Sequence, residues 1–286
     1  MRVVDETQHD VARLMDADRD FGPVRSGDLH KDFFAWLHHL ARRVPLLRRR
    51  VVLSEEAQGH RAQYPAIDEL RRALQTGQNV GPWLSERTLL HPADHRADLM
   101  FNDWQILHFH LGNIYASPTT VERTGPILCA HVTAEEATFL DVQPHRQWAR
   151  LELLEILLRT NPAIMARYEA RGCAGERLTD EQYLALRQGG GNALIQLDGR
   201  AFMPAMGRMS SQHAVRIVLY ADNFWLAAES LKHGFENDQI EEPFRRLIYS
   251  QIGLPVRLGA HYDPTGLSII DKNRMGLQLH KMKPIE

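Results

Sequence analysis

The 286-residue chain has few cysteines and no long apolar run. Its two cysteines, Cys129 and Cys173, are too few for a disulfide scaffold, and this number is typical of a reducing compartment. No apolar segment approaches the roughly 18–20 residues that a membrane span needs. The polar, acidic N-terminus also lacks the apolar stretch of a secretory signal peptide. We therefore expect a cytoplasmic protein that does not interact with a membrane.

The chain also has little net charge and none of the common nucleotide or hydrolase motifs. Its formal net charge is -2 at pH 7, so binding to nucleic acid would need a local basic patch. GxGxxG, Walker, GxSxG and HExxH motifs are absent, which argues against nucleotide-driven enzymes, serine hydrolases and zincins. With 44% hydrophobic and 24% charged residues, the composition is that of a globular protein with a substantial core.

Helical periodicity dominates the first hundred residues. We expect helices over about 6–20, 26–44 and 65–76, where apolar residues recur at helical spacing. After residue 98 the pattern changes to short strands separated by further helices. We therefore predict an α+β fold, in which a helical N-terminal region (1–98) precedes a domain (99–286) built on an antiparallel sheet with packed helices.

The most informative stretch is residues 103–112, which reads DWQILHFHLG and alternates like a strand. One face is expected to be apolar and to contain Leu107, Phe109 and Leu111. The other is expected to contain Trp104, Ile106, His108 and His110. Two imidazoles two residues apart on a strand have Cβ atoms roughly 6–7 Å apart. That spacing lets them share a substrate, a phosphate or a metal ion.

Further titratable groups follow on the next predicted elements. Residues 126–132 and 138–142 are expected to form a hairpin that contains His131 and Asp141. His145 and Arg146 follow where the hairpin leads into a helix that ends near residue 160. Adjacent strands would gather these groups into one pocket.

Two kinds of chemistry fit this set of residues. In metal-independent RNA cleavage, one imidazole takes the 2′-hydroxyl proton, a second protonates the leaving oxygen, and an arginine stabilises charge on phosphorus. The candidate catalytic residues for this chemistry are His108, His110, Asp141, His145 and Arg146. Alternatively, a divalent metal could be bound. Its candidate ligands are His108, His110, His131 and Asp141.

A basic segment precedes the strands and offers a surface for phosphate groups. The candidate nucleic-acid-binding residues are Arg42, Arg43, Arg48, Arg49 and Arg50, with Arg208 in a later loop. The alternative is a solvated helix end, since cations are favourable near a helix C-terminus.

Two resemblances bear on function. The string D-W-x-I-x-H-x-H-L followed by D-x-x-x-H-x-x-W resembles a motif of a widespread group of uncharacterised bacterial proteins. The matching positions are Asp103, Trp104, Ile106, His108, His110, Leu111, Asp141, His145 and Trp148. The match spans roughly residues 100–230, and it implies no particular activity. The order of helices, strand and hairpin is also similar to the small toxin ribonucleases of the barnase and RelE-like class, although this chain is longer than those toxins. That similarity implies metal-independent cleavage by groups on the sheet.

The sequence therefore predicts a cytoplasmic endoribonuclease that needs no cofactor and acts in a toxin or phage-defence system. Its expected partners are an RNA substrate and an antitoxin or defence-system protein. The alternatives are a metal-dependent nuclease or hydrolase and a non-catalytic binding component of such a system.

Overall fold

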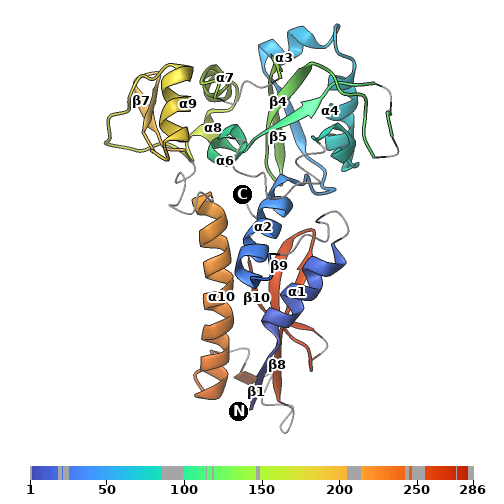
Figure 1. The fold of residues 1–286 in the computed structure, drawn as a ribbon, viewed down its shortest axis with the longest axis vertical. Coiled ribbons are helices and arrows are strands. Elements are labelled where there is room, and N and C mark those ends of the chain that lie inside the picture. The colour runs from blue at the N-terminus through green and yellow to red at the C-terminus, as the bar shows by residue number, and fades with distance from the viewer. Residues whose placement is uncertain are drawn as a thin grey trace. The chain divides into compact units, whose positions relative to one another are not determined.

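A computed structural model gives the fold of the chain (Figure 1). The residues that it describes are 2–18, 21, 26–85, 99–113, 115–117, 119–145, 149–204, 214–241, 245–246, 255–274 and 276–282. The chain forms two compact units, one of Met1–Leu37 with Ile217–Ile285 and one of His38–Arg216. The boundary predicted after residue 98 falls inside the second unit, because strands from both sides of it pair in one sheet.

The predicted α+β class is confirmed, with helices near the N-terminus and strands organised in sheets. Among the described residues, no helix is both long and apolar enough to cross a bilayer.

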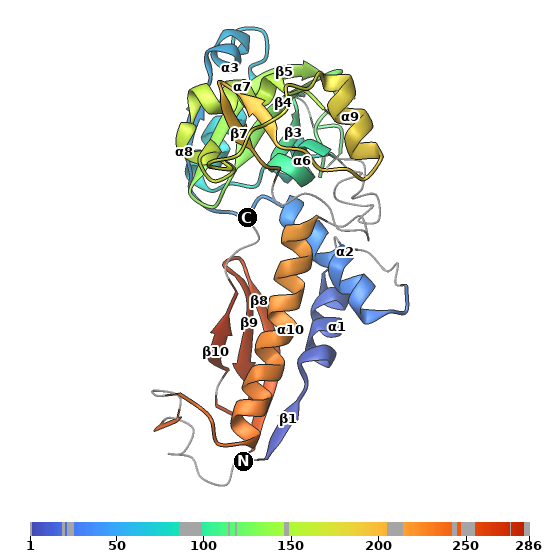
Figure 2. The same cartoon turned by 90° about the vertical axis from the view of Figure 1, so that its left-hand side faces the viewer.

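The first unit is built on a four-stranded sheet of order β1-β8-β9-β10. Its strands are β1 (Val3–Asp5), β8 (Val256–Asp263), β9 (Gly266–Asp271) and β10 (Leu277–Lys281). Its helices are α1 (Thr7–Ala17), the part of α2 (Leu29–Arg42) up to Leu37, and α10 (Val215–Glu236) from Ile217 onward. β1 pairs with β8 in parallel and the other pairs are antiparallel. Figure 2 shows α10 running beside this sheet, and the Leu267 N–H donates to the Tyr220 hydroxyl across that contact at 3.4 Å.

Aromatic residues from α2 and α10 form the centre of the first unit. The Phe33 ring lies 5.7 Å from Phe224 and 5.1 Å from Trp225, between ring centroids. Trp36 contacts Tyr262 of β8 at 5.5 Å, and its indole N–H donates to Asp18 at 2.9 Å. Such rings bury a large apolar area, so the helical stripe of α2 that the sequence predicted is the core face of this unit.

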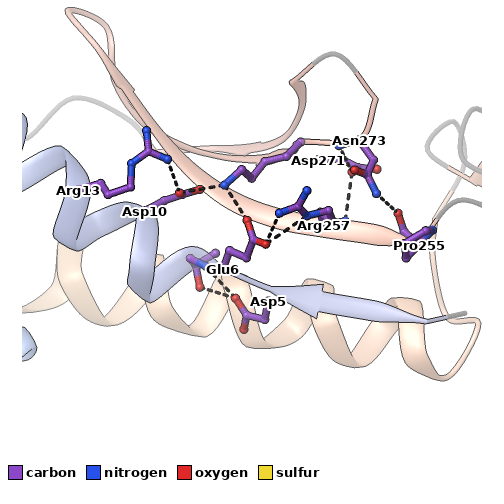
Figure 3. A network of polar contacts seen from close by, with 10 residues as sticks. Asp5, Glu6, Asp10, Arg13, Pro255, Arg257, Asp271 and Asn273 are labelled. Atoms are coloured by element: carbon purple, nitrogen blue, oxygen red, sulfur yellow. Dashed lines mark hydrogen bonds and ion pairs between the residues drawn. The ribbon is translucent and has the colours of Figure 1, made fainter.

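An ionic network attaches the N-terminus to the C-terminal strands (Figure 3). Lys272 lies 2.7 Å from Glu6 Oε2 and 3.0 Å from Asp10 Oδ1, while Arg257 Nε donates to Glu6 Oε1 at 3.1 Å. Hydrogen bonds from Lys272 and then Arg257 lower the pKa of Glu6 to about 2. These contacts join β1 and α1 to β8 and the turn after β9.

The second unit contains the sheet β2-β5-β4-β3. Its strands are β2 (Arg50–Leu53), β3 (Ile106–His110), β4 (Pro126–Val132) and β5 (Glu136–Pro144). The other elements in this part are α3 (Glu55–His60), α4 (Ala66–Thr76), η1 (Gly81–Trp83), α6 (Leu99–Trp104), α7 (Glu152–Thr160), α8 (Pro162–Met165), α9 (Asp180–Gln188), β6 (Ile195–Leu197) and β7 (Arg200–Phe202). The predicted hairpin is confirmed as β4 and β5. The edge strand β2 joins β5 in parallel, which the prediction of an antiparallel sheet did not include.

Each face of this sheet packs on its own apolar cluster. One cluster includes Leu107, Phe109, Leu128 and Phe139 together with buried residues of α4. The opposite cluster includes Ile106, Cys129 and Leu140 with residues of α7 and α8. The predicted separation of Leu107, Phe109 and Leu111 from the histidine side of β3 is therefore confirmed.

Candidate functional site

The strand register places most of the predicted site residues on one face of the sheet. His108 pairs with Cys129, which pairs with Asp141, and His110 pairs with Ile127, which pairs with Gln143. Directly paired residues of antiparallel strands point to the same side. We use the term histidine face for the side that carries His108, His110, Asp141 and Gln143.

His145 joins the histidine face from the end of β5. Its imidazole stacks on that of His110, with ring centroids 5.7 Å apart and an interplanar angle of 26°. His145 is exposed, whereas His110 is only 5% exposed. The predicted proximity of these two histidines is therefore present in the structure.

The buried His110 is held in its neutral form at physiological pH. Burial is the main cause that lowers its pKa to about 4, followed by the positive charges of Arg123 and His145. Within the described part of the chain, its buried Nδ1 atom has no hydrogen-bond partner. His110 is therefore a neutral ring on which His145 stacks.

A second oriented imidazole comes from His60 at the end of α3. Its Nε2 atom lies 3.2 Å from Asp141 Oδ1. Asp141 is itself fixed, because Oδ1 accepts from the Val142 N–H at 2.7 Å and Oδ2 accepts from the Gln143 amide. A carboxylate that holds one ring nitrogen fixes the orientation of an imidazole. The second nitrogen, Nδ1, is then the one that can face a substrate.

His60 is a site residue that the sequence pattern did not predict. α3 follows β2, whose Leu53 pairs with Phe139 of β5, and the Ser54 N–H donates to the Phe139 carbonyl at 2.9 Å. Ser54 also caps α3 by accepting from the Ala57 N–H at 2.9 Å. This parallel pairing between distant segments brings His60 to Asp141. No local sequence pattern predicts the pairing.

His131 lies at the other end of the sheet, where it pairs with Ile106. It is 1% exposed, and its Nε2 atom is 3.4 Å from the Tyr168 hydroxyl. Burial, then the charges of Arg167 and Arg216, lower its pKa to about 3. His131 is therefore a core histidine.

The proposed metal ligands are not brought together. No three His, Cys, Asp or Glu side chains in the described ranges are arranged so that they could hold a metal ion. The set His108, His110, His131 and Asp141 lies wholly within those ranges. These four side chains therefore do not form a metal site.

The first two residues of the DWxIxHxHL string have a structural role. Asp103 and Trp104 end helix α6, and the chain turns at Gln105, with φ 57°, before β3 begins at Ile106. The strand expected from residue 103 thus starts later. The fully buried Asp103 accepts from Arg187 Nε and Nη2 at 2.8 and 2.7 Å and from the Tyr183 hydroxyl at 2.6 Å. The aspartate anchors α6 to α9.

Two arginines of the basic segment are buried and make intramolecular contacts. The Arg42 guanidinium lies over the Phe101 ring at 5.2 Å, and Arg42 is 3% exposed. Arg49 is 5% exposed and donates to the carbonyls of Thr133, Pro45 and Leu47 at 2.6, 2.9 and 2.9 Å. Neither side chain is positioned to meet a phosphate, so the expected nucleic-acid-binding role of these two arginines has no support in the structure.

The remaining arginines of this segment are Arg43, Arg48 and Arg50. Arg43 contacts the His39 ring, Arg48 is exposed, and Arg50 is exposed and paired with Glu136. Arg50 is aligned with the start of β5, and His145 follows its end, roughly 30 Å further along an extended strand. Arg50 therefore lies at the opposite end of β5 from His145. Arg146 and Arg208 lie outside the described residues.

The loop after β3 returns to the His110 end of the sheet. A Cβ atom on Gly112 would overlap the backbone of Glu122, so glycine is required for this close approach. The Leu111 N–H donates to Thr124 Oγ1 at 2.9 Å, and Arg123 donates to the Leu84 carbonyl at 3.1 Å. These contacts bring the positive charge of Arg123 near His110, a contribution that the sequence analysis did not foresee.

Comparison of the chain with protein-family models, curated proteins and solved structures found no match. The two resemblances drawn from the sequence therefore stay predictions.

Proposed function

We propose that the protein is a metal-independent endoribonuclease whose acid–base groups are His60 and His145. The supporting observation is that β5 provides both anchors: Asp141, which holds His60, and the strand end, from which His145 reaches His110. Residues 141 and 145 of an extended chain have Cα atoms about 13 Å apart. In this proposal a ribose-phosphate unit binds between the two imidazoles.

In this proposal His60 is the general base. It takes the proton of a ribose 2′-hydroxyl while the 2′ oxygen forms a bond to phosphorus. The imidazolium that forms is stabilised by Asp141, which also keeps the ring oriented. Asp141 is therefore a positioning residue.

His145 is the general acid of the same step. The bond between phosphorus and the 5′ oxygen breaks, and His145 gives its proton to that oxygen, so the products are a 2′,3′-cyclic phosphate and a 5′-hydroxyl. His110, whose pKa is lowered to about 4, stacks on the His145 ring. Arg123 and His108 both act electrostatically on His110, and we assign them to the developing charge on phosphorus.

The wider setting is part of the same proposal. Both cysteines are unpaired, which supports a cytoplasmic location. An RNA-cleaving enzyme in the cytoplasm needs control, so we retain an antitoxin or defence-system protein as the proposed partner.

Cleavage of labelled RNA by the purified chain in EDTA tests the proposal. We expect His60→Ala and His145→Ala each to reduce kcat by about 10²–10⁴, the usual contribution of an acid–base group. His233→Ala, an exposed histidine of α10, is the matched control and should retain full activity. Equal activity in all variants would reject the assignment, and RNA binding without cleavage by the wild type would indicate a non-catalytic binding protein.

A further inference from the structure

We propose that Tyr115 is a stacking platform for a nucleobase next to the scissile phosphate. This inference rests on the proposed function of the histidine face and adds the part of the substrate that is recognised. It would make the substrate a single-stranded RNA with an unpaired base beside the cleaved bond.

The exposure of Tyr115 is the first observation. The side chain belongs to the few large apolar residues at the surface of the described chain, with 57% of its area exposed. It is not loose, because its ring contacts Trp83 edge to face, with centroids 6.3 Å apart. Trp83 is 7% exposed and belongs to the apolar core. An exposed aromatic ring with a fixed orientation is suited to base stacking.

The position of Tyr115 is the second observation. Trp83 is followed by Leu84, which forms a bridge with Phe109, the residue before His110. Tyr115 forms a second bridge with Val121, on the returning limb of the same loop. Tyr115 follows His110 by five residues, so their Cα atoms lie at most about 17 Å apart. That distance suits the neighbouring nucleotide rather than the one that reacts.

The loop that carries Tyr115 is held by its own hydrogen bonds. The Ala116 N–H donates to the Thr120 carbonyl at 2.9 Å, and Ser117 Oγ accepts from the Thr120 N–H at 3.1 Å. The Val121 N–H donates to the Pro82 carbonyl at 3.0 Å. A platform ordered before binding avoids the entropic cost of ordering a side chain on the ligand.

Two exposed charged side chains, Glu122 and Arg123, follow Val121 next to the platform, and the positive one suits RNA. Arg123 is exposed, and its charge acts on His110 while its guanidinium donates to Leu84, the residue after Trp83. An aromatic ring beside a cation is the combination that binds single-stranded nucleic acid with little preference among bases.

The test uses the full chain and two oligonucleotides with one cleavable ribonucleotide in a 2′-O-methyl background. One has a base on each neighbouring nucleotide, and the other has an abasic residue on one side. We expect Tyr115→Ala to raise KM by about 5- to 150-fold for the first substrate, which is 1–3 kcal/mol of stacking expressed as a ratio. Tyr115→Phe should keep the wild-type KM, and Leu226→Ala, an exposed apolar control on α10, should change nothing.

The abasic substrate distinguishes stacking from a structural effect. For the substrate whose abasic residue lies at the platform, wild type and Tyr115→Ala should have equal KM values. Active Tyr115→Ala enzyme with an unchanged KM for the first substrate would overturn the inference and leave the proposed function intact. Binding of an uncleavable, fully 2′-O-methyl oligonucleotide tests the case in which the platform is correct and the proposed chemistry is wrong. Tyr115-dependent binding without cleavage supports the platform against the proposed chemistry, and absence of binding overturns both.

Discussion

His60 Nε2 lies 3.2 Å from Asp141 Oδ1, and the parallel pairing of β2 with β5 creates this contact. Asp141 is 9% exposed and is also held by Gln143 and by the Val142 N–H. The imidazole at the edge of the histidine face thus has a fixed orientation before any substrate binds.

Asp141→Asn removes the carboxylate charge while it retains the size of the side chain. We expect kcat for RNA cleavage to fall by about 10²–10⁴ with little change in KM, because the ring loses its orienting anion rather than a substrate contact. The pH–rate profile should change as well, since the charge beside the general base is lost. Asp198→Asn, in the turn between β6 and β7, is a matched control that should leave both quantities unchanged.

Asp103→Asn is expected to destabilise the protein strongly. Both partners of the Asp103–Arg187 ion pair are fully buried, so the variant leaves an uncompensated charge in the core. The free energy of unfolding should fall by about 3–5 kcal/mol in urea titrations. Glu169→Gln, which removes the half-exposed pair with Arg200, should cost at most about 1 kcal/mol. The combined Asp103→Leu and Arg187→Met variant should be more stable than Asp103→Asn, and the reverse order would contradict this explanation.

The local sequence pattern was sufficient to predict much of the fold. Helical spacing predicted α4, which ends at Thr76 before Gly77 in a left-handed conformation, with φ 75°. The Asp198-Gly199 pair is typical of a two-residue hairpin turn, and these residues have φ 48° and 72° between β6 and β7. Alternation also assigned the two faces of β3 correctly.

Contacts between distant segments account for what the sequence did not reveal. Asp103 and Trp104 alternate with the strand residues in sequence, yet buried bonds to α9 hold them in a helix. His60 has the local sequence of an ordinary surface histidine, and only the pairing of β2 with β5 brings it to Asp141. Arg42 and Arg49 belong to a segment whose composition is typical of phosphate binding, but tertiary contacts bury both side chains. None of these contacts can be predicted from a short stretch of sequence, because the partners are distant along the chain.

The network around Glu6 predicts acid sensitivity in the first unit. Because the pKa of Glu6 is lowered from 4.5 to about 2, its stabilising contribution is present above pH 4.5 and is lost as the pH falls toward 2. Glu6→Gln should lower the Tm of that unit by a few degrees at pH 7, and the difference from wild type should shrink with acidification. A difference that grows as the pH falls would contradict the assigned ion pairs.

The buried His131 predicts a different pH dependence for the second unit. Its folded-state pKa of about 3 lies below the ordinary value of 6.5, so the unfolded chain takes up the proton first. Stability should therefore fall as the pH drops from 6.5 toward 3, by up to about 1.4 kcal/mol per pH unit for this group. His131→Leu should weaken that dependence in urea titrations, whereas His233→Ala should not. An unchanged slope in His131→Leu would show that this histidine is not buried in its neutral form.

The chemical ends of the cleaved RNA test the central claim most directly. Acid–base catalysis by His60 and His145 predicts that the purified chain, in EDTA, produces 2′,3′-cyclic phosphate and 5′-hydroxyl ends. It also predicts no cleavage at a 2′-O-methyl nucleotide, which has no 2′-hydroxyl proton to remove. Products with 3′-hydroxyl and 5′-phosphate ends, or cleavage at the 2′-O-methyl position, would contradict the account.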